Sequence, residues 1–586
     1  MDCTTCDSPA KRVDRPHLFF AHELDTCPAC EVKIEARVVF RDGQVVHLLH
    51  CTSCGPQERE LGIDSKSYIQ AFLERGKVPD GLVGDHLFKT TTSTCPQCLA
   101  LVEAQVVIRT VKVSGPSAEG VEGADERRVF FLKDCTRCGP SEALVSEDAG
   151  YYVKAYAFAR EGTEPLKFRS EVEHGCPTDC GTCSDHEQHT CLPIVEVTDH
   201  CNLECPICIV DNQYSTHMDT ATFSKIVDGL IEAEGTCESI AISGGEPTSH
   251  PQILELVKIA SRPEIGRVVV ITNGIRLGKD RAFATKLKEL GAYIGLQLDG
   301  FSAEVHTKIR GRDLTDEKAA ALAAIRELDL PTQMIFVATK GINDHQIGQA
   351  VDLFLAMPQI LSLNFQPVAY TGHGGGTFDH DPMDRLTIPG IVRRVEQQTA
   401  GRLTYTDFFP LPCSHPQCVS LTYLLTLEDG TSVPFARFTD FEKYGTLLRS
   451  SATLPALPEV EEALGDLIHD VFARQDEIEH GPEILKALRR SLDQMFPRKP
   501  LTAKQSFQVS ERQSKSIFLH HYMDRHDFDL ERLRKCCHHY PQIDGRIMPA
   551  CGFNMFHRGA AKGPETPRAA FSRPGGRAPF SLPVIQ

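Results

Sequence analysis

The sequence has no tryptophan, no long apolar run and no excess of positive charge. A membrane-spanning helix needs about 18 or more predominantly apolar residues in a row, and because no such run occurs, no transmembrane helix is expected. The formal net charge of −17 argues against broad, sequence-independent nucleic-acid binding and gives no overall attraction to an anionic membrane. The N-terminus, Met1-Asp2-Cys3, lacks the charged and apolar regions of a signal peptide, so we expect a cytoplasmic protein.

Cysteine, in contrast, is abundant, with 23 residues in a chain of 586. A reducing cytosol favours their use as metal ligands over disulfides. Hydrophobic residues make up 41% of the chain, which is enough for ordinary cores, and the length predicts several domains.

Five CxxC pairs organise the first 140 residues. They are Cys3/Cys6, Cys27/Cys30, Cys51/Cys54, Cys95/Cys98 and Cys135/Cys138. Two such pairs joined by a hairpin make a tetrahedral four-thiolate site for zinc or a single iron. Cys27/Cys30 can share a metal with Cys51/Cys54, and Cys95/Cys98 with Cys135/Cys138. This predicts two ribbon-like modules from a duplicated unit. The first pair has no obvious partner. Structural zinc and rubredoxin-like iron that relays electrons are both open, and Ser114–Glu126 is expected to be an exposed loop.

Two further cysteine runs share one spacing and follow each other along the chain. They are Cys176-x3-Cys180-x2-Cys183 and Cys201-x3-Cys205-x2-Cys208. The first run gains a fourth cysteine, Cys191, after seven intervening residues, and the second gains none. Four thiolates close a four-iron cluster, whereas three leave one iron free to bind another group. The spacing therefore predicts a closed cluster beside an open one. A zinc site, or a closed cluster with its fourth ligand elsewhere, is the alternative for the second run.

Residues 192–372 alternate apolar strands with amphipathic helices, which predicts parallel β–α–β units. Strands are expected at Leu192–Val197, Glu238–Ser243, Arg267–Thr272, Tyr293–Leu298, Gln333–Thr339 and Leu361–Phe365, and helices include Phe223–Ala233 and Arg281–Leu290. The second of these strands runs into Gly244-Gly245-Glu246-Pro247. Without Cβ atoms, a glycine backbone can approach a ligand closely.

The pattern changes after residue 400. A strand pair is expected at Ser420–Leu427 and Ser432–Phe435, followed by a largely helical stretch, Val460–Phe496. Five cysteines in this part offer four ligands for one more cluster: Cys413, Cys418, Cys536, Cys537 and Cys551. Because neighbouring cysteines rarely reach the same metal, one of Cys536 and Cys537 is expected to be a spare. Buried structural thiols are the alternative, and His538 and His539 are expected to pack rather than bind metal.

A strand, the Cys201–Cys208 run, a helix and a strand ending in Gly244–Pro247 together resemble the radical S-adenosylmethionine (radical SAM) superfamily. Three more features narrow the resemblance. They are the first cysteine run leading directly into the second, Val368-Ala-Tyr-Thr-Gly372, and the ending Cys536-Cys-His-His-Tyr540, Asp544-Gly-Arg546, Cys551. This pattern resembles the tetraether lipid synthases, which join lipid tails by carbon–carbon bonds. Members of that family are also described as class D methyltransferases of 7,8-dihydro-6-hydroxymethylpterin.

The resemblance implies an α/β fold. A partial (β/α)6 radical SAM barrel, with its site at the C-terminal strand ends, would follow a zinc-ribbon or rubredoxin-like region and precede a C-terminal auxiliary-cluster α+β domain. The domains expected are 1–150, the cysteine-rich metal-binding region; 151–191, the auxiliary-cluster segment; 192–372, the barrel; 400–556, the C-terminal domain; and 557–586, a disordered tail.

The resemblance also implies the cofactors. They are a [4Fe–4S] cluster on Cys201, Cys205 and Cys208 with S-adenosylmethionine on its free iron, two auxiliary [4Fe–4S] clusters, and zinc or mononuclear iron in the N-terminal modules. The cofactor contacts implied are Gly244, Gly245, Glu246, Pro247, Asn273, Gln297, Asp299 and Arg310. Arg310 is the expected carboxylate clamp, because a planar guanidinium suits that group.

We therefore expect a radical SAM enzyme that generates a 5′-deoxyadenosyl radical, abstracts hydrogen from unactivated carbons and couples lipid tails. An auxiliary cluster would store the first carbon radical, with simple electron relay as the alternative. The expected partners are a lipid substrate, drawn from the membrane surface through an apolar tunnel, and an electron donor such as ferredoxin or flavodoxin; nucleic acid is not expected. Two other functions stay open: a class D C-methyltransferase acting on a 7,8-dihydropterin, and a non-catalytic multi-cluster electron-transfer protein.

Overall fold

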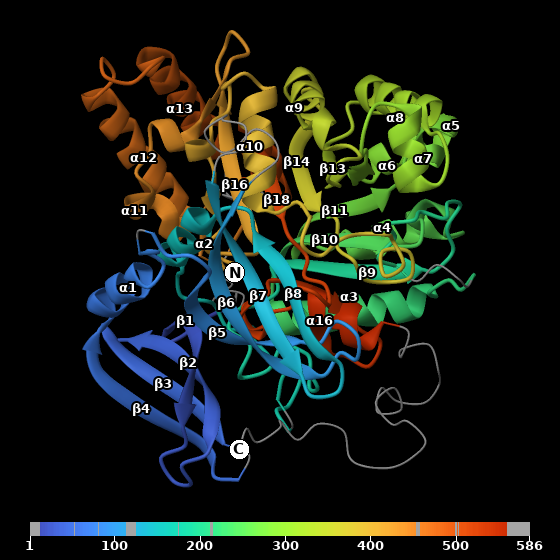
Figure 1. Ribbon diagram of the computed structural model, residues 1–586. Helices are drawn as coiled ribbons and strands as arrows, with labels where there is room; N and C mark the ends of the chain where they lie inside the picture. The colour runs from blue at the N-terminus through green and yellow to red at the C-terminus, as the bar shows by residue number, and fades with distance from the viewer. Residues whose placement is uncertain are drawn as a thin grey trace, which may run out of the picture.

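Two small N-terminal sheets stand beside one large sheet that runs through the rest of the chain (Figure 1). This computed structural model describes residues 12–558 apart from 52, 80, 113–124, 174, 211–214, 450, 453–456, 499–500 and 502. Cys3 and Cys6, nearly all of the expected loop at 114–126, and the tail from 559 onward lie outside the described residues. Within the described residues, no helix is both long and apolar enough to cross a membrane.

The N-terminal region repeats one antiparallel sheet of four strands in simple chain order. The first copy, module 1, contains β1 (Leu18–Thr26), β2 (Lys33–Arg41), β3 (Gln44–Cys51), β4 (Gly55–Asp64) and α1 (Ser65–Glu74). The second copy, module 2, contains β5 (Asp85–Thr94), β6 (Leu101–Lys112), β7 (Asp125–Cys135), β8 (Gly139–Ser146) and α2 (Ala149–Ala155). Asp64 caps α1, since its side chain accepts from the Ser67 N–H. Phe72 of α1 and Tyr152 of α2 meet in one shared core.

Six parallel strands form the partial barrel, as the alternation of strands and helices predicted. The strands are β9 (Leu192–Thr198), β10 (Cys237–Gly244), β11 (Ile265–Thr272), β12 (Tyr293–Gln297), β13 (Thr332–Ala338) and β14 (Ile360–Pro367). The helices between them are α3 (Thr220–Glu234), α4 (Ile253–Ala260), α5 (Ile275–Lys279), α6 (Arg281–Glu289), α7 (Ala303–Arg310), α8 (Thr315–Leu328) and α9 (Ile347–Ala356). The outer face of the strands packs against these helices in the largest core.

Burial alternates along the barrel strands. Val195 and Val197 of β9 are each 1% exposed in the outer core, while Glu196 between them is half-buried. Successive strand residues point to opposite faces, so Glu196 belongs to the inner face. Ser243 on β10, Gln297 on β12 and Gln366 on β14 are half-buried in the same alternation. The inner face near the C-terminal strand ends is therefore polar and reached by solvent.

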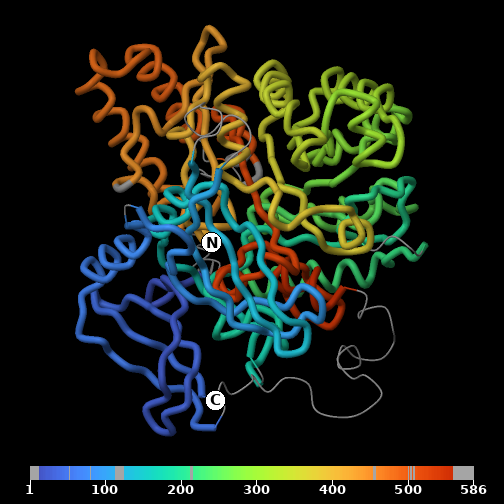
Figure 2. Tube along the Cα trace, viewed as in Figure 1, coloured from blue at the N-terminus to red at the C-terminus, as the bar shows by residue number. Residues whose placement is uncertain are grey.

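Strands after residue 400 extend the barrel sheet at both of its edges. β18 (Ser514–His520) pairs with β14 at one edge, and β19 (His538–Pro541) pairs with β9 at the other. Residues 521–537 connect these edges, and Tyr522 and Met523 pack there against Ile194 on the inner face. Figure 2 shows this red C-terminal tube running beside the green barrel strands.

The remaining helices and strands all follow β14 in the chain. They are α10 (Ile388–Gln398), β15 (Phe409–Pro410), β16 (Val419–Thr426), β17 (Ser432–Pro434), α11 (Phe441–Tyr444), α12 (Pro458–Ala473), α13 (Gly481–Met495), α14 (Ala503–Gln513), α15 (Leu530–Arg534), β20 (Ile547–Pro549) and α16 (Ala550–Gly552). The helical pair α12 and α13 confirms the helices expected at 460–496 and packs in a core of its own.

Candidate metal centres and cofactor site

The open cysteine run forms the loop that follows β9. Cys201 and Cys205 contact a small apolar cluster built around Leu203 and Ile275. Burial raises the thiol pKa of Cys201 to about 12 and also raises that of Cys208. A metal that binds these sulfurs must therefore displace their protons, so loading of the site is coupled to proton release.

The glycine-rich strand end lies directly beside this loop. Gly244 ends β10 with a φ of +126°, and a Cβ added there would lie 2.1 Å from the Thr198 carbonyl oxygen. Only glycine fits both this backbone conformation and this close contact with β9. The Gly245 N–H donates to the Thr198 carbonyl at 2.7 Å, which fixes the strand end against the start of the cysteine loop.

Glu246 connects two strand ends through its buried carboxylate. Its Oε1 accepts from the Thr248 N–H, the Thr248 hydroxyl at 2.6 Å and the Thr272 hydroxyl at 2.7 Å. Its Oε2 accepts from the Asn273 N–H at 2.8 Å. The side chain thus braces the end of β10 against the end of β11. What this motif can offer a cofactor is its backbone.

A buried lysine that the sequence patterns did not single out joins the next two strand ends. Lys318 on α8 donates from Nζ to the Asn273 carbonyl at 2.7 Å and to the Gln297 carbonyl at 2.5 Å. Burial, reinforced by the nearby Arg310 charge, lowers the pKa of Lys318 to about 8. The Asn273 side chain donates to the Asn202 side chain at 2.7 Å, so this network reaches the cysteine loop itself.

Asp299 and Arg310 form a buried ion pair at the edge of the cysteine loop. Arg310 Nε donates to Asp299 Oδ2 at 2.7 Å, and Asp299 Oδ1 accepts from the Val337 N–H at 2.9 Å. Burial disfavours the Arg310 charge, but Asp299 and Cys205 outweigh it and raise the pKa of Arg310. Nη2 of Arg310 is buried without a hydrogen-bond partner among the described residues. The guanidinium therefore keeps one donor nitrogen for a carboxylate beside Cys205, as a clamp requires.

A glycine-rich segment after β14 covers the cysteine loop from the other side. The N–H groups of Gly374 and Gly375 donate to the Cys208 carbonyl at 3.0 and 2.9 Å. A cavity of about 650 Å³ opens beside Cys205 between the two segments. Its lining residues are Glu204, Cys205, Pro206, His373, Gly374, Thr377, Phe378 and Asp379.

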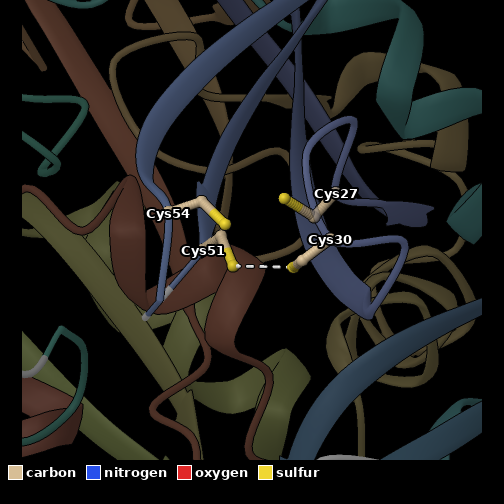
Figure 3. A group of neighbouring side chains, drawn as sticks. All are labelled: Cys27, Cys30, Cys51 and Cys54. Atoms are coloured by element: carbon tan, nitrogen blue, oxygen red, sulfur yellow. Dashed lines mark hydrogen bonds between the residues drawn. The ribbon is translucent and has the colours of Figure 1, made fainter.

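The N-terminal modules bring their CxxC pairs together as the duplicated unit predicted. Figure 3 shows the sulfurs of Cys27, Cys30, Cys51 and Cys54 facing one another. The Cys30 and Cys51 sulfurs lie 3.6 Å apart, and those of Cys98 and Cys135 lie 3.8 Å apart. Tetrahedral zinc with bonds of about 2.3 Å separates its sulfur ligands by about 3.8 Å. The spacing in both modules therefore fits a single tetrahedral metal atom.

Cys191 does not join the first cysteine run, which corrects our prediction. It lies in a buried group with Cys413 and Cys537, all three sulfurs within 4.8 Å of one another. The cause is the pairing of β9 with β19, because the N–H groups of Cys191 and Leu192 both donate to the Cys537 carbonyl. A contact between segments this far apart in the chain overrides the local spacing.

The five C-terminal cysteines do not gather around one metal either. Cys413 and Cys537 belong to the group just described, whereas Cys418, Cys536 and Cys551 lie close enough to interact electrostatically. Burial first, and then Cys536 and Cys418, raise the pKa of the Cys551 thiol. Cys537 lies with Cys191 and Cys413, whereas Cys418 acts on the Cys536 thiol, so the two adjacent cysteines face different groups and neither stands apart.

The first cysteine run, Cys176 to Cys183, lies near Cys418, Cys536 and Cys551. Burial, followed by Cys176, Cys536 and Cys183, raises the pKa of the Cys180 thiol. A Cβ added at Gly552 would lie 2.7 Å from the Cys180 sulfur, so residues 176–183 lie against the C-terminal segment. Leaving aside the open run, the N-terminal modules and Cys237, the described thiols form two neighbourhoods: Cys191 with Cys413 and Cys537, and Cys176, Cys180 and Cys183 with Cys418, Cys536 and Cys551. Each combines residues from before and after the barrel. The compact group of Cys191, Cys413 and Cys537 could hold an auxiliary cluster or another metal.

Family comparison identifies the barrel, since residues 195–354 match the model of the radical SAM superfamily. The chain contains a radical SAM domain at these residues. Its radical SAM domain thus accounts for the open cysteine run at the strand ends, and a [4Fe–4S] cluster and S-adenosylmethionine are its cofactors. The residues around Cys201–Cys208 fit this pair, with three thiols, a close glycine backbone and a free guanidinium donor.

Two characterised relatives are similar in sequence. The 7,8-dihydro-6-hydroxymethylpterin dimethyltransferase of Methanocaldococcus jannaschii is 28% identical over 513 residues, which span 80% of this chain and 94% of that protein. The GTP 3′,8-cyclase of Chlorobaculum tepidum is 33% identical over 165 residues, 27% of this chain and 48% of the cyclase. The chain therefore spans nearly all of the first relative and about half of the second.

Among solved structures, Streptococcus suis SuiB bound to S-adenosylmethionine resembles this chain with a TM-score of 0.30 and 18% identity. The match covers 36% of this chain and 47% of SuiB. A radical SAM methyltransferase from Sphaerobacter thermophilus has a TM-score of 0.29 and 13% identity, covering 55% of this chain and 76% of that one.

Proposed function

We propose that this radical SAM enzyme is a C-methyltransferase acting on a 7,8-dihydropterin. The supporting observation is the similarity to the M. jannaschii pterin dimethyltransferase across 94% of that protein's length. The polar inner face of the barrel, with Glu196, Ser243, Gln297 and Gln366, agrees with a polar heterocyclic substrate better than with a hydrocarbon chain. The cofactors supply a 5′-deoxyadenosyl radical when reduced by one electron.

The residues of the chain would provide the setting for that chemistry. Arg310, held by Asp299, offers a donor for the cofactor carboxylate beside Cys205. Glu246 and Lys318 fix three neighbouring strand ends at defined spacings. The electron would come from a small carrier protein of the ferredoxin or flavodoxin class.

A direct assay tests the proposal. Anaerobic protein with reconstituted iron–sulfur clusters is incubated with S-adenosylmethionine, a reductant and 7,8-dihydro-6-hydroxymethylpterin, and products are measured by mass spectrometry. We expect 5′-deoxyadenosine together with a pterin in which one or two hydrogen atoms are replaced by methyl groups, each supplied by a further S-adenosylmethionine. Formation of 5′-deoxyadenosine without any methylated pterin would reject the pterin as substrate, whereas no 5′-deoxyadenosine would reject the enzymatic assignment as a whole.

Coupling of lipid tails is the second candidate, and one observation favours it. Cys551, which lies near Cys418 and Cys536, packs in the same cluster as Ile194 and Ala241 on the inner barrel face. An auxiliary cluster there would border the substrate space, as storage of a carbon radical requires. The same assay with a dialkyl glycerol lipid tests this candidate, because tail coupling removes two hydrogen atoms from the product mass.

A further inference from the structure

The two N-terminal metal modules repeat one sheet, but their metal sites have different surroundings. In module 1, Cys30 and Cys54 are exposed, and the residues beside the site pair with one another, as His47 does with Asp25 at 2.6 Å. In module 2, the equivalent Cys98 and Cys138 are half-buried, and residues next to the site contact the C-terminal segment that crosses the barrel. The duplication has therefore produced two unequal sites.

A buried lysine ties the module 2 site to that segment. Lys133 of β7 donates from Nζ to the Thr94 carbonyl at 3.0 Å and to the His526 carbonyl at 2.8 Å. Thr94 directly precedes the ligand Cys95, and its hydroxyl donates to the Arg525 carbonyl at 3.3 Å. The position of residues 525–526 thus depends on the backbone that begins the metal knuckle.

From His526 the contacts continue to the open cysteine run. Nε2 of His526 lies 3.2 Å from Nε2 of His380, so one ring donates to the other. The His380 ring stacks on Tyr370 with centroids 3.5 Å apart and planes at 5°. Tyr370 packs in one cluster with Ile207, one of the two residues between Cys205 and Cys208.

The same segment also holds the backbone of Tyr370. Asp524 accepts from the Tyr370 N–H at 3.0 Å, and Arg385 donates to Asp524 at 2.8 Å with both side chains fully buried. Removing one partner of a buried ion pair is strongly destabilising, so loss of Arg385 or Asp524 would disturb this anchor. Tyr370 is consequently fixed by its backbone from one side and by His380 from the other.

We propose that the module 2 metal centre positions the loop of the open cluster, through His526, His380 and Tyr370, and that module 1 has no such role. His526 and His380 are positioning residues in this proposal, since they act on the cysteine loop through Tyr370. The sulfur spacing of module 2 fits zinc or a single iron, and the role needs only that a metal be bound. The proposal is independent of whether the substrate is a pterin or a lipid.

Paired ligand variants of the full-length protein test the difference between the modules. Cys138→Ser in module 2 and Cys54→Ser in module 1 occupy equivalent positions of the repeat, and metal analysis verifies which centre each has lost. The readout is the electron paramagnetic resonance (EPR) signal of the reduced open cluster and the fraction of that signal that changes on adding S-adenosylmethionine. We expect Cys138→Ser to lower this fraction at least fivefold. The decrease caused by Cys54→Ser should be at least three times smaller. Equal effects of the two variants would overturn the proposal.

A second variant keeps the test decisive if the module 2 ligand variant does not fold. His526→Ala retains every cysteine, and the exposed His469→Ala is its matched control. We expect at least a fivefold lower cofactor-responsive fraction for His526→Ala, with metal content unchanged, and partial recovery in His526→Gln, which can still hydrogen-bond to His380. A purely structural role would lower yield or melting temperature without changing that fraction. A parental EPR response in His526→Ala would refute the proposal.

Discussion

Replacing Glu246 by glutamine tests the bracing role of its carboxylate. Oε1 accepts three hydrogen bonds and Oε2 accepts one, from the Asn273 N–H. The glutamine oxygen should take the place of Oε1, which leaves its amide group facing the Asn273 N–H. A buried donor without a partner costs about 1–3 kcal/mol, and the loss of charge weakens the remaining three bonds. We therefore expect Glu246→Gln to lose about 2–4 kcal/mol of unfolding free energy.

The assay follows thermal unfolding of the barrel and binding of S-adenosylmethionine. Because 1 kcal/mol shifts Tm by about 2–4 °C for a domain of this size, we expect a decrease of roughly 5–15 °C. Cofactor affinity, measured by calorimetry on anaerobically reconstituted protein, should fall at least tenfold as the end of β11 moves. Glu255→Gln, on the exposed face of α4, is the matched control and should change neither quantity. Parental Tm and affinity in Glu246→Gln would refute the bracing argument.

Three further outcomes are expected. Joint replacement of Cys201, Cys205 and Cys208 by alanine should abolish 5′-deoxyadenosine formation while the remaining iron is kept; an unchanged yield would contradict the open-cluster assignment. Cys191→Ala should release the metal bound with Cys413 and Cys537 and spare the Cys176–Cys183 set; loss of metal from that set instead would restore our original grouping. Arg310 holds the pKa of Asp299 below its usual value despite burial. The ionised Asp299 therefore stabilises the fold fully above about pH 5, and this stabilisation is lost as the pH falls through the folded-state pKa of Asp299. The stability difference between the parent and Asp299→Asn should accordingly shrink from pH 6 to pH 3, and a difference that grows on acidification would contradict the sign.

The barrel was predictable because its signals are local. Each strand is a short apolar run bounded by polar residues, and the six expected ranges agree with the observed strands to within a few residues. The CxxC pairs of the N-terminal modules were equally accessible, since a hairpin brings them together by chain connectivity alone.

The auxiliary thiol groups were not predictable in this way. Cys191 meets Cys537 because two strands more than 300 residues apart in the sequence pair side by side. Spacing along the chain favoured Cys176, Cys180 and Cys183 as the partners of Cys191. Spacing carries no information on the order of strands in the sheet. Lys318 did leave a signal that could have been used, since it shares one helical face with the buried Ala321 and Ile325. A lysine on an apolar stripe needs a polar partner at the core.

The position of β18 and β19 on opposite edges of the barrel has a consequence for biosynthesis. Six barrel strands emerge from the ribosome by residue 367, but both edges of their sheet stay unpaired until residues 514–541 follow. Open sheet edges invite pairing with other chains, and nascent domains are exposed to this for as long as translation takes. The cysteines of the two thiol neighbourhoods likewise come partly from before the barrel strands and partly from after them in the sequence. Metal can therefore be bound by the complete thiol groups only after residues 536–551 have been synthesised.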